Sequence, residues 1–234
     1  MNVIGLIAGN SRYHWGWWRG GQLQRTWHTP WESATTVWVE QHCPWPLYVV
    51  SPVPSQVARW QKHPRAYVLT LSDIPLPGVY ATLGVDRALA AWGAAQIYGT
   101  PVLVMDAGTA LTLNAVDAKG VFVGGAILPG LGLQCRSLHQ GTGALPLVAL
   151  PETLPPLWAK DTVSAIQSGI GYTAVAGLNF YLDCWSGQVV ITGGDGEWFY
   201  RHLHPRWPSL IWAPDLLIQA LGCWQQLQGP KRLL

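Results

Sequence analysis

Charged side chains are scarce in this chain. They make up 11% of its 234 residues, against about 25% in an average soluble domain. The 14 Lys and Arg nearly balance the 12 Asp and Glu, for a net charge of +2, and no basic run occurs. Binding to nucleic acid or to an anionic membrane surface needs a basic patch, so both classes are excluded.

Long apolar runs are also lacking. No window of about 18 apolar residues predicts a membrane-spanning helix, and the first fifteen residues carry no cationic region typical of a signal peptide. The four cysteines form no C-x-x-C pair, and we expect them to be reduced, buried thiols. They are Cys43, Cys135, Cys184 and Cys223. These absences predict a cytoplasmic protein.

Several catalytic motifs are missing. None of the lysines is followed by Ser or Thr, which excludes a P-loop. Neither H-E-x-x-H nor G-x-S-x-G occurs. The stretch 169–174 matches a loose dinucleotide fingerprint, but it lies inside a predicted helix rather than after a strand. A nucleotide site in this chain would therefore be built from residues other than a P-loop or a dinucleotide-binding fingerprint.

The remaining pattern alternates between strands and helices. Apolar runs predict strands at 2–9, 47–52, 101–109 and from 188, and a hairpin at 111–128 that turns at Asp117–Gly120. Helices are expected at 86–98, from 161 or 162 to about 184, and from 214 to about 228. This order predicts an α/β fold. A composition shift near Gly99 suggests two domains, 1–99 and 100–234.

Three predicted strands end in turns of small residues, in LIAGNS, VLVMDAGT and VVITGGDG. Glycine lets the backbone approach a ligand closely, and the amides of such turns are available to an anion. One such turn has little meaning. Three in a short chain favour a nucleotide site divided among several loops, and the likeness of the first two suggests a duplicated unit.

The few carboxylates narrow the chemistry further. Phosphoryl transfer needs positioned phosphates, a cation and a group that orients or deprotonates the nucleophile. Asp106 at a strand end can hold a cation, and Thr109 can bind phosphate. Asp86 can take a proton from a hydroxyl, with Arg87 as an anion clamp. The alternative is that Asp86 only caps a helix and Arg87 is a solvated charge.

Six segments together resemble the type III pantothenate kinases of the acetate kinase/sugar kinase/Hsp70/actin superfamily. They are IAGNSRYHW (7–15), YATLGVDRALAAWGA (80–94), VMDAGTALTLNAV (104–116), GGAILPGLGLQCRSLHQGTGALPLV (124–148), DTVSAIQSGIGY (161–172) and TGGDG (192–196). The resemblance implies two ribonuclease-H-like domains with mixed sheets flanked by helices, and a homodimer. It also implies ATP-dependent phosphorylation of pantothenate, the first step of coenzyme A synthesis, with Mg²⁺ and K⁺ or NH₄⁺.

The resemblance also implies roles for individual residues. Asp86 would be the general base, and Asp106 would bind the monovalent cation. Pantothenate would contact Tyr80, Gly84, Val85, Arg87 and Thr162, the last of these across a dimer interface. ATP would contact Gly9, Asn10, Ser11, Arg12, Thr109, Gly193 and Gly194.

One residue departs from the family pattern. The first phosphate motif of the family begins with Asp, as DxGNT/S, and this chain has Ile7 there. Loss of a metal-facing carboxylate usually costs orders of magnitude in rate. Either Asp106, water and phosphates hold the metal, or the protein is a weakened kinase or a noncatalytic regulatory relative. A kinase for another small hydroxylated substrate is a further alternative. Because Asp86, Asp106 and Thr109 are retained, we expect retained pantothenate kinase activity.

Overall fold

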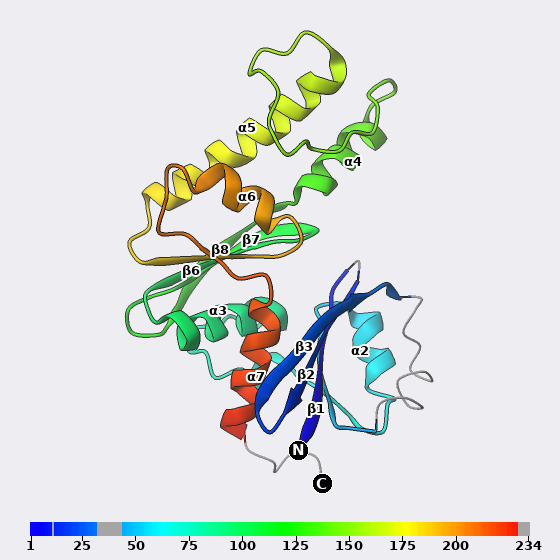
Figure 1. The fold of residues 1–234 in the computed structure, drawn as a ribbon, viewed down its shortest axis with the longest axis vertical. Coiled ribbons are helices and arrows are strands. Elements are labelled where there is room, and N and C mark those ends of the chain that lie inside the picture. Colours follow the sequence, from blue (N-terminus) through cyan, green and yellow to red (C-terminus); the bar gives the residue numbers. More distant parts are fainter. Residues whose placement is uncertain (11, 32–43, 229–234) are drawn as a thin grey trace. The chain divides into compact units, whose positions relative to one another are not determined.

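A computed structural model describes residues 1–10, 12–31 and 44–228 (Figure 1). The chain divides into two compact units. Unit 1 comprises 1–100, 116–124 and 215–234, and unit 2 comprises 101–115 and 125–214. Each unit holds one five-stranded sheet with helices beside it. This confirms the predicted α/β class with mixed sheets flanked by helices.

The sheet of unit 1 has the strand order β3-β2-β1-β4-β5. Its strands are β1 (Asn2–Ala8), β2 (Tyr13–Arg19), β3 (Gln22–Thr29), β4 (Leu47–Val50) and β5 (Ala66–Val68). The pairs β1–β2 and β2–β3 are antiparallel, whereas β4 is parallel to both β1 and β5. The β1–β2 turn therefore carries the first of the predicted glycine loops.

The two faces of this sheet pack against different helices. Ile4, Leu6 and Trp15 form a buried cluster with Trp60 of α2 (Pro54–Trp60). On the other face, a Cβ on Gly5 would lie 2.7 Å from Leu221 of α7 (Leu216–Gln228). Glycine therefore lets α7 approach the sheet closely.

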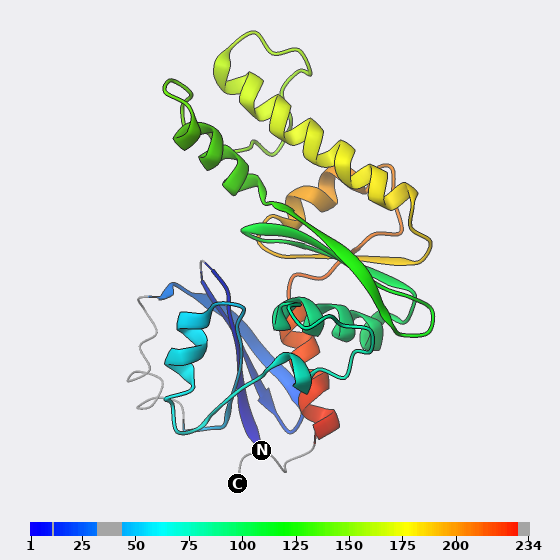
Figure 2. The ribbon, with the colours of Figure 1, turned by 180° about the vertical axis from the view of Figure 1, so that it is seen from behind.

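Helices α3 (Val85–Tyr98) and α7 also lie side by side (Figure 2). A Cβ on Gly93 would come within 2.1 Å of the Ala220 Cβ, so small residues set this close contact. The short 3₁₀ helix η2 (Leu71–Asp73) precedes α3 and is closed by Thr70 and Asp73 in a capping box. The packing of α7 on β1 and α3 holds the C-terminal helix in unit 1.

The sheet of unit 2 has the order β10-β9-β6-β7-β8. Its strands are β6 (Val102–Ala107), β7 (Ala110–Val116), β8 (Phe122–Pro129), β9 (Gln188–Thr192) and β10 (Ile211–Trp212). Its helices are α4 (Leu131–Gly141), α5 (Thr162–Asp183) and α6 (Gly196–Leu203). Apolar residues of β6, β7 and β9 share one buried core with residues of all three helices.

Most elements expected from the sequence are confirmed. The three predicted helices correspond to α3, α5 and α7, and Asp161 caps α5 by accepting a hydrogen bond from the Ser164 amide at 2.9 Å. The hairpin β2–β3 and the helices α2, α4 and α6 were not expected. The domain ranges 1–99 and 100–234 stay a prediction; the compact units meet near residue 100 but place α7 with the N-terminal sheet.

The structure can be compared with two expectations from the sequence, namely buried, reduced cysteines and no membrane-spanning helix. Cys135, Cys184 and Cys223 are free, and Cys184 is exposed rather than buried as expected; Cys43 lies outside the described residues. Across 1–10, 12–31 and 44–228, none of the helices has both the length and the apolar character to cross a membrane.

Candidate functional site

The first candidate phosphate loop follows β1. Gly9 is partly exposed, and Asn10 and Arg12 are exposed, so all three are accessible to a ligand. Ser11, which was predicted with them, lies outside the described residues. Ile7 sits two residues before this loop, is only 8% exposed, and pairs in register with His14 on β2.

A polar cluster flanks this loop. His14 Nε2 lies 3.0 Å from Asp215 Oδ1, and the Thr26 hydroxyl donates to Asp215 Oδ2 at 3.3 Å. The His28 ring packs on the His14 ring with centroids 4.1 Å apart. Burial, the nearby His28 and Arg12 lower the pKa of His14 from 6.5 to about 4, although Asp215 opposes this change. His14 is therefore neutral at pH 7, and sequence reasoning did not find this cluster.

The predicted general base lies in the first turn of α3. Burial raises the pKa of Asp86, while the backbone amides of Arg87 and Asp86 and the Arg87 charge act in the opposite direction. Gly84 is the N-cap, and a Cβ there would lie 2.6 Å from Asp86 Oδ1. Glycine thus leaves room for a carboxylate whose raised pKa suits proton acceptance.

The predicted pantothenate residues of unit 1 gather around this carboxylate. Arg87 follows Asp86 and donates a hydrogen bond to the Tyr80 hydroxyl at 3.0 Å. Arg87 is buried, at 9% exposure, whereas Tyr80 is exposed. The alternative interpretation of Arg87 as a solvated charge is therefore wrong. A guanidinium can pair with a carboxylate, and a phenol can donate or accept a hydrogen bond.

In unit 2 the loops after β6 and β9 meet. Asp106 and Thr192 pair in register on these parallel strands, and the Asp195 amide donates to the Ala107 carbonyl at 2.9 Å. Gly193 has φ +93°, and a Cβ there would lie 2.6 Å from Asp106 Oδ1. Only glycine fits this conformation and contact without strain. Two glycine turns far apart in sequence thus form one surface.

A third segment supports the same surface. The Gly130 amide donates to the Thr109 carbonyl at 3.0 Å, and a Cβ on Gly130 would come within 2.2 Å of the Gly108 carbonyl oxygen. Gly130 therefore fixes the loop that carries Thr109. It belongs to the GGAILPG motif, but its structural role was not predicted. Gly194, the remaining predicted ATP residue, is exposed beside Gly193.

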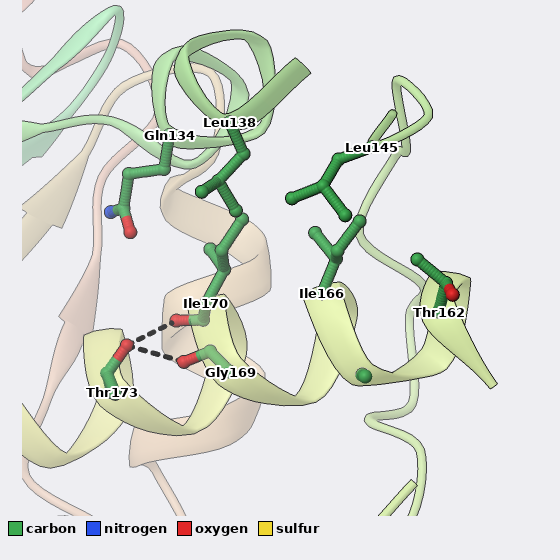
Figure 3. Close-up of a pocket in the computed structure, with 9 residues that line it drawn as sticks. Gln134, Leu138, Leu145, Thr162, Ile166, Gly169, Ile170 and Thr173 are labelled. Carbon is green, nitrogen blue, oxygen red and sulfur yellow. Dashed lines mark hydrogen bonds between the residues drawn. The ribbon is translucent and has the colours of Figure 1, made fainter. Parts of the chain in front are cut away.

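Thr162 lies apart from the residues just described, at the first position of α5. It is exposed and lines a cavity of about 440 Å³ between α4 and α5 (Figure 3). Apolar side chains supply most of the wall, and Figure 3 shows Leu138, Leu145, Ile166 and Ile170 around this space. The cavity offers shape and apolar contact, and none of the described residues that line it is charged.

The sequence and fold were compared with known proteins. Residues 6–181 match the family model for type III pantothenate kinase. A type III pantothenate kinase from Gloeobacter violaceus is 47% identical over 221 residues, covering 91% of this chain and 90% of the relative. Another, from Thermosynechococcus vestitus, is 46% identical over 216 residues, covering 90% and 84%.

Solved structures show the same fold at low sequence identity. A Baf family protein from Campylobacter jejuni superposes with a TM-score of 0.70 at 17% identity, covering 97% of this chain and 98% of that one. The activator of 2-hydroxyisocaproyl-CoA dehydratase from Clostridium difficile gives 0.56 at 11% identity, covering 95% and 92%. The fold is that of the actin-like ATPases, with two ribonuclease-H-like domains.

Proposed function

The chain belongs to the type III pantothenate kinase family, and from that premise we propose which of its residues perform the reaction. The enzyme phosphorylates pantothenate with ATP, as the first step of coenzyme A biosynthesis. The observation that carries the assignment of roles is the half-buried Asp86 carboxylate with its raised pKa beside Arg87. We also propose that the enzyme works in the cytoplasm, where ATP and pantothenate meet.

Asp86 acts as the general base. It takes the proton of the pantothenate hydroxyl as the phosphoryl group transfers, and a raised pKa makes it a better proton acceptor. Pantothenate carries a carboxylate, which suits the Arg87 guanidinium. Tyr80, held by Arg87, and the backbone of Gly84 and Val85 complete the contacts from this segment. Thr162 contributes a hydroxyl to the same substrate.

ATP binds through several glycine turns. Gly9, Asn10, Ser11 and Arg12 contact phosphate oxygens, with Arg12 offsetting their charge. Thr109 contacts phosphate from the second motif. Gly193 and Gly194 lie near the nucleoside, because their lack of side chains permits close approach. These roles agree with the exposure of the described loop residues.

Mg²⁺ would bind together with ATP. This ion keeps several waters and is usually held through one or two carboxylates and substrate phosphates rather than a protein cage. In the parts of the chain that the structure describes, no three His, Cys, Asp or Glu side chains gather to hold a metal. Mg²⁺ carried by ATP would neutralise phosphate charge when bound. Asp106 binds the monovalent cation, K⁺ or NH₄⁺.

The enzyme works as a homodimer through the side of unit 2 that carries α5. Large apolar groups are exposed along this helix and just before it, including Trp158 at 85% and Phe180 at 67%. Ile166 and Ile170 of the same helix line the cavity described above. Such an exposed apolar surface is typical of a protein interface. A second copy of this chain would cover it and approach Thr162.

Direct detection of the product tests this function. Purified protein is incubated with pantothenate, ATP, Mg²⁺ and K⁺, and phosphopantothenate is measured by mass spectrometry, with Na⁺ replacing K⁺ in a parallel reaction. Potassium-dependent product supports the assignments. Product from an Ile7→Asp variant but none from the native chain would instead identify a relative that has lost catalysis.

A further inference from the structure

Ile7 shares its sheet face with polar residues of the neighbouring strands. In the β1–β2 pair Ile7 lies opposite His14, and in the β2–β3 pair His14 lies opposite His28. Directly opposed residues of antiparallel strands point to the same face, with Cβ atoms about 5 Å apart. The Ile7 side chain is thus a cross-strand neighbour of the His14 imidazole.

The helix on this face supplies a carboxylate. Gly5 and Gly16 lie two residues from Ile7 and His14, and Cβ atoms on them would meet Leu221 and Ile218 of α7. Asp215 immediately precedes that helix and reaches His14 at 3.0 Å, across 201 positions of sequence. Packing of α7 on the sheet therefore holds the Asp215 carboxylate beside the first phosphate loop.

The hydrogen bond to Asp215 fixes what His14 can offer. A carboxylate only accepts, so Nε2 of His14 donates to Asp215, and Nδ1 of the neutral ring is left as an acceptor. Among the described residues, His14 forms its side-chain hydrogen bond with Asp215. Waters bound to Mg²⁺ are hydrogen-bond donors that need acceptors such as a carboxylate or an imidazole nitrogen. Ile7 has no such atom.

We propose that His14, oriented by Asp215, accepts a hydrogen bond from the water shell of the ATP-bound Mg²⁺, which the Ile7 side chain opposite it cannot do. The inference rests on the proposed binding of ATP phosphates at residues 9–12. His14 and Asp215 are positioning residues in this arrangement. They orient the hydrated ion, while Arg12 offsets phosphate charge.

Nuclear magnetic resonance tests the location without turnover. Full-length protein with ¹⁵N-labelled histidine is titrated with Mn²⁺·ATP in the absence of pantothenate. The paramagnetic ion should broaden the ring signals of His14 and of His28, whose ring is stacked on it, and should leave His63 sharp. His63 is the internal control, because it packs on Trp60 against the opposite face of the same sheet. If His14 stays as sharp as His63 once ATP is bound, the proposal is overturned.

Magnesium titrations of activity test the chemistry. In His14→Leu, which has no acceptor, the Mg²⁺ concentration for half-maximal rate should rise about 10-fold or more, in line with other metal outer-shell losses. His14→Gln keeps a donor and an acceptor and should stay within about threefold of wild type. Adding Ile7→Asp to His14→Leu should restore most of the affinity. An unchanged Mg²⁺ requirement in His14→Leu would overturn the proposal.

The role of Asp215 is tested with a matched control variant. Asp215→Asn should raise the Mg²⁺ requirement in the same direction as His14→Leu, whereas Asp183→Asn removes a carboxylate from a surface ion pair with Arg206 and should not. An equal effect of both would overturn the specific role. Circular dichroism establishes that each variant is folded.

If the wild type made no phosphopantothenate, the proposed function would fail, and the Mn²⁺·ATP spectra would still decide this inference.

Discussion

The neutral, half-buried His14 makes the stability of unit 1 depend on pH. Its pKa is lowered from 6.5 to about 4 by burial first, and then by His28 and Arg12 against the opposing pull of Asp215. Between those pH values the unfolded chain binds a proton that the folded chain does not. The stability due to the neutral ring is therefore present above pH 6.5 and is lost as the pH falls toward 4.

The size of this effect follows from the two pKa values. For one group with these constants, linkage gives a loss of about 2 kcal/mol between pH 7 and pH 5. The His14→Gln variant keeps a donor to Asp215 but does not titrate. We expect the wild type to lose about 2 kcal/mol more unfolding free energy than His14→Gln over this range.

Urea unfolding followed by tryptophan fluorescence measures the difference. His28, whose pKa is also lowered by burial, is present in both proteins, so its contribution largely cancels in the comparison. Parallel pH dependences for wild type and His14→Gln would show that His14 is protonated when folded, and would refute the reasoning. A smaller slope in the wild type than in the variant would refute it as well.

Three further predictions concern the reaction and the assembly. Asp86→Asn should lower kcat about 100-fold or more while leaving KM for pantothenate within about threefold; steady-state kinetics would contradict the base role if both changed equally. Asp106→Asn should flatten the rate response to K⁺ against Na⁺, and an unchanged potassium titration would remove Asp106 from the cation site. Trp158→Ser should shift the sedimentation equilibrium toward monomer by removing a large exposed apolar group; an intact dimer would place the interface elsewhere.

Local patterns in the sequence were enough for the strands that carry the loops. The cores of β1, β6 and β9 are continuous apolar runs, and each run stops at a glycine turn. Such runs are typical of strands buried on both faces. The helix α3 was equally clear, because alanines fill its sequence. These elements place Asp86 and Asp106 correctly at element ends.

Other elements carried weaker or misread signals. The β2–β3 hairpin turns at Gly20 and Gly21, with φ of +59° and +81°, and a glycine pair is a known hairpin signal. The strand before this turn, β2, lacks a regular alternation of apolar and polar residues, because Trp15 and Trp18 are both buried. The helix α4 begins in a glycine-containing stretch with little helical preference. Its formation depends on packing against α5, which no local pattern reveals.

The meaning of Ile7 shows most clearly what one strand's sequence leaves out. Compared with the motif DxGNT/S that the resemblance implies, the chain has Ile7 in place of Asp, a side chain without a hydrogen-bond acceptor. Read across the sheet, the register places His14 opposite this position, and the packing of α7 brings Asp215 to His14 from 201 positions away. Neither the register nor the docking of α7 is encoded within the motif itself. A substitution at one site of a phosphate-binding loop therefore has to be judged by the whole face it belongs to, because a neighbouring strand and a distant helix can supply the missing atom.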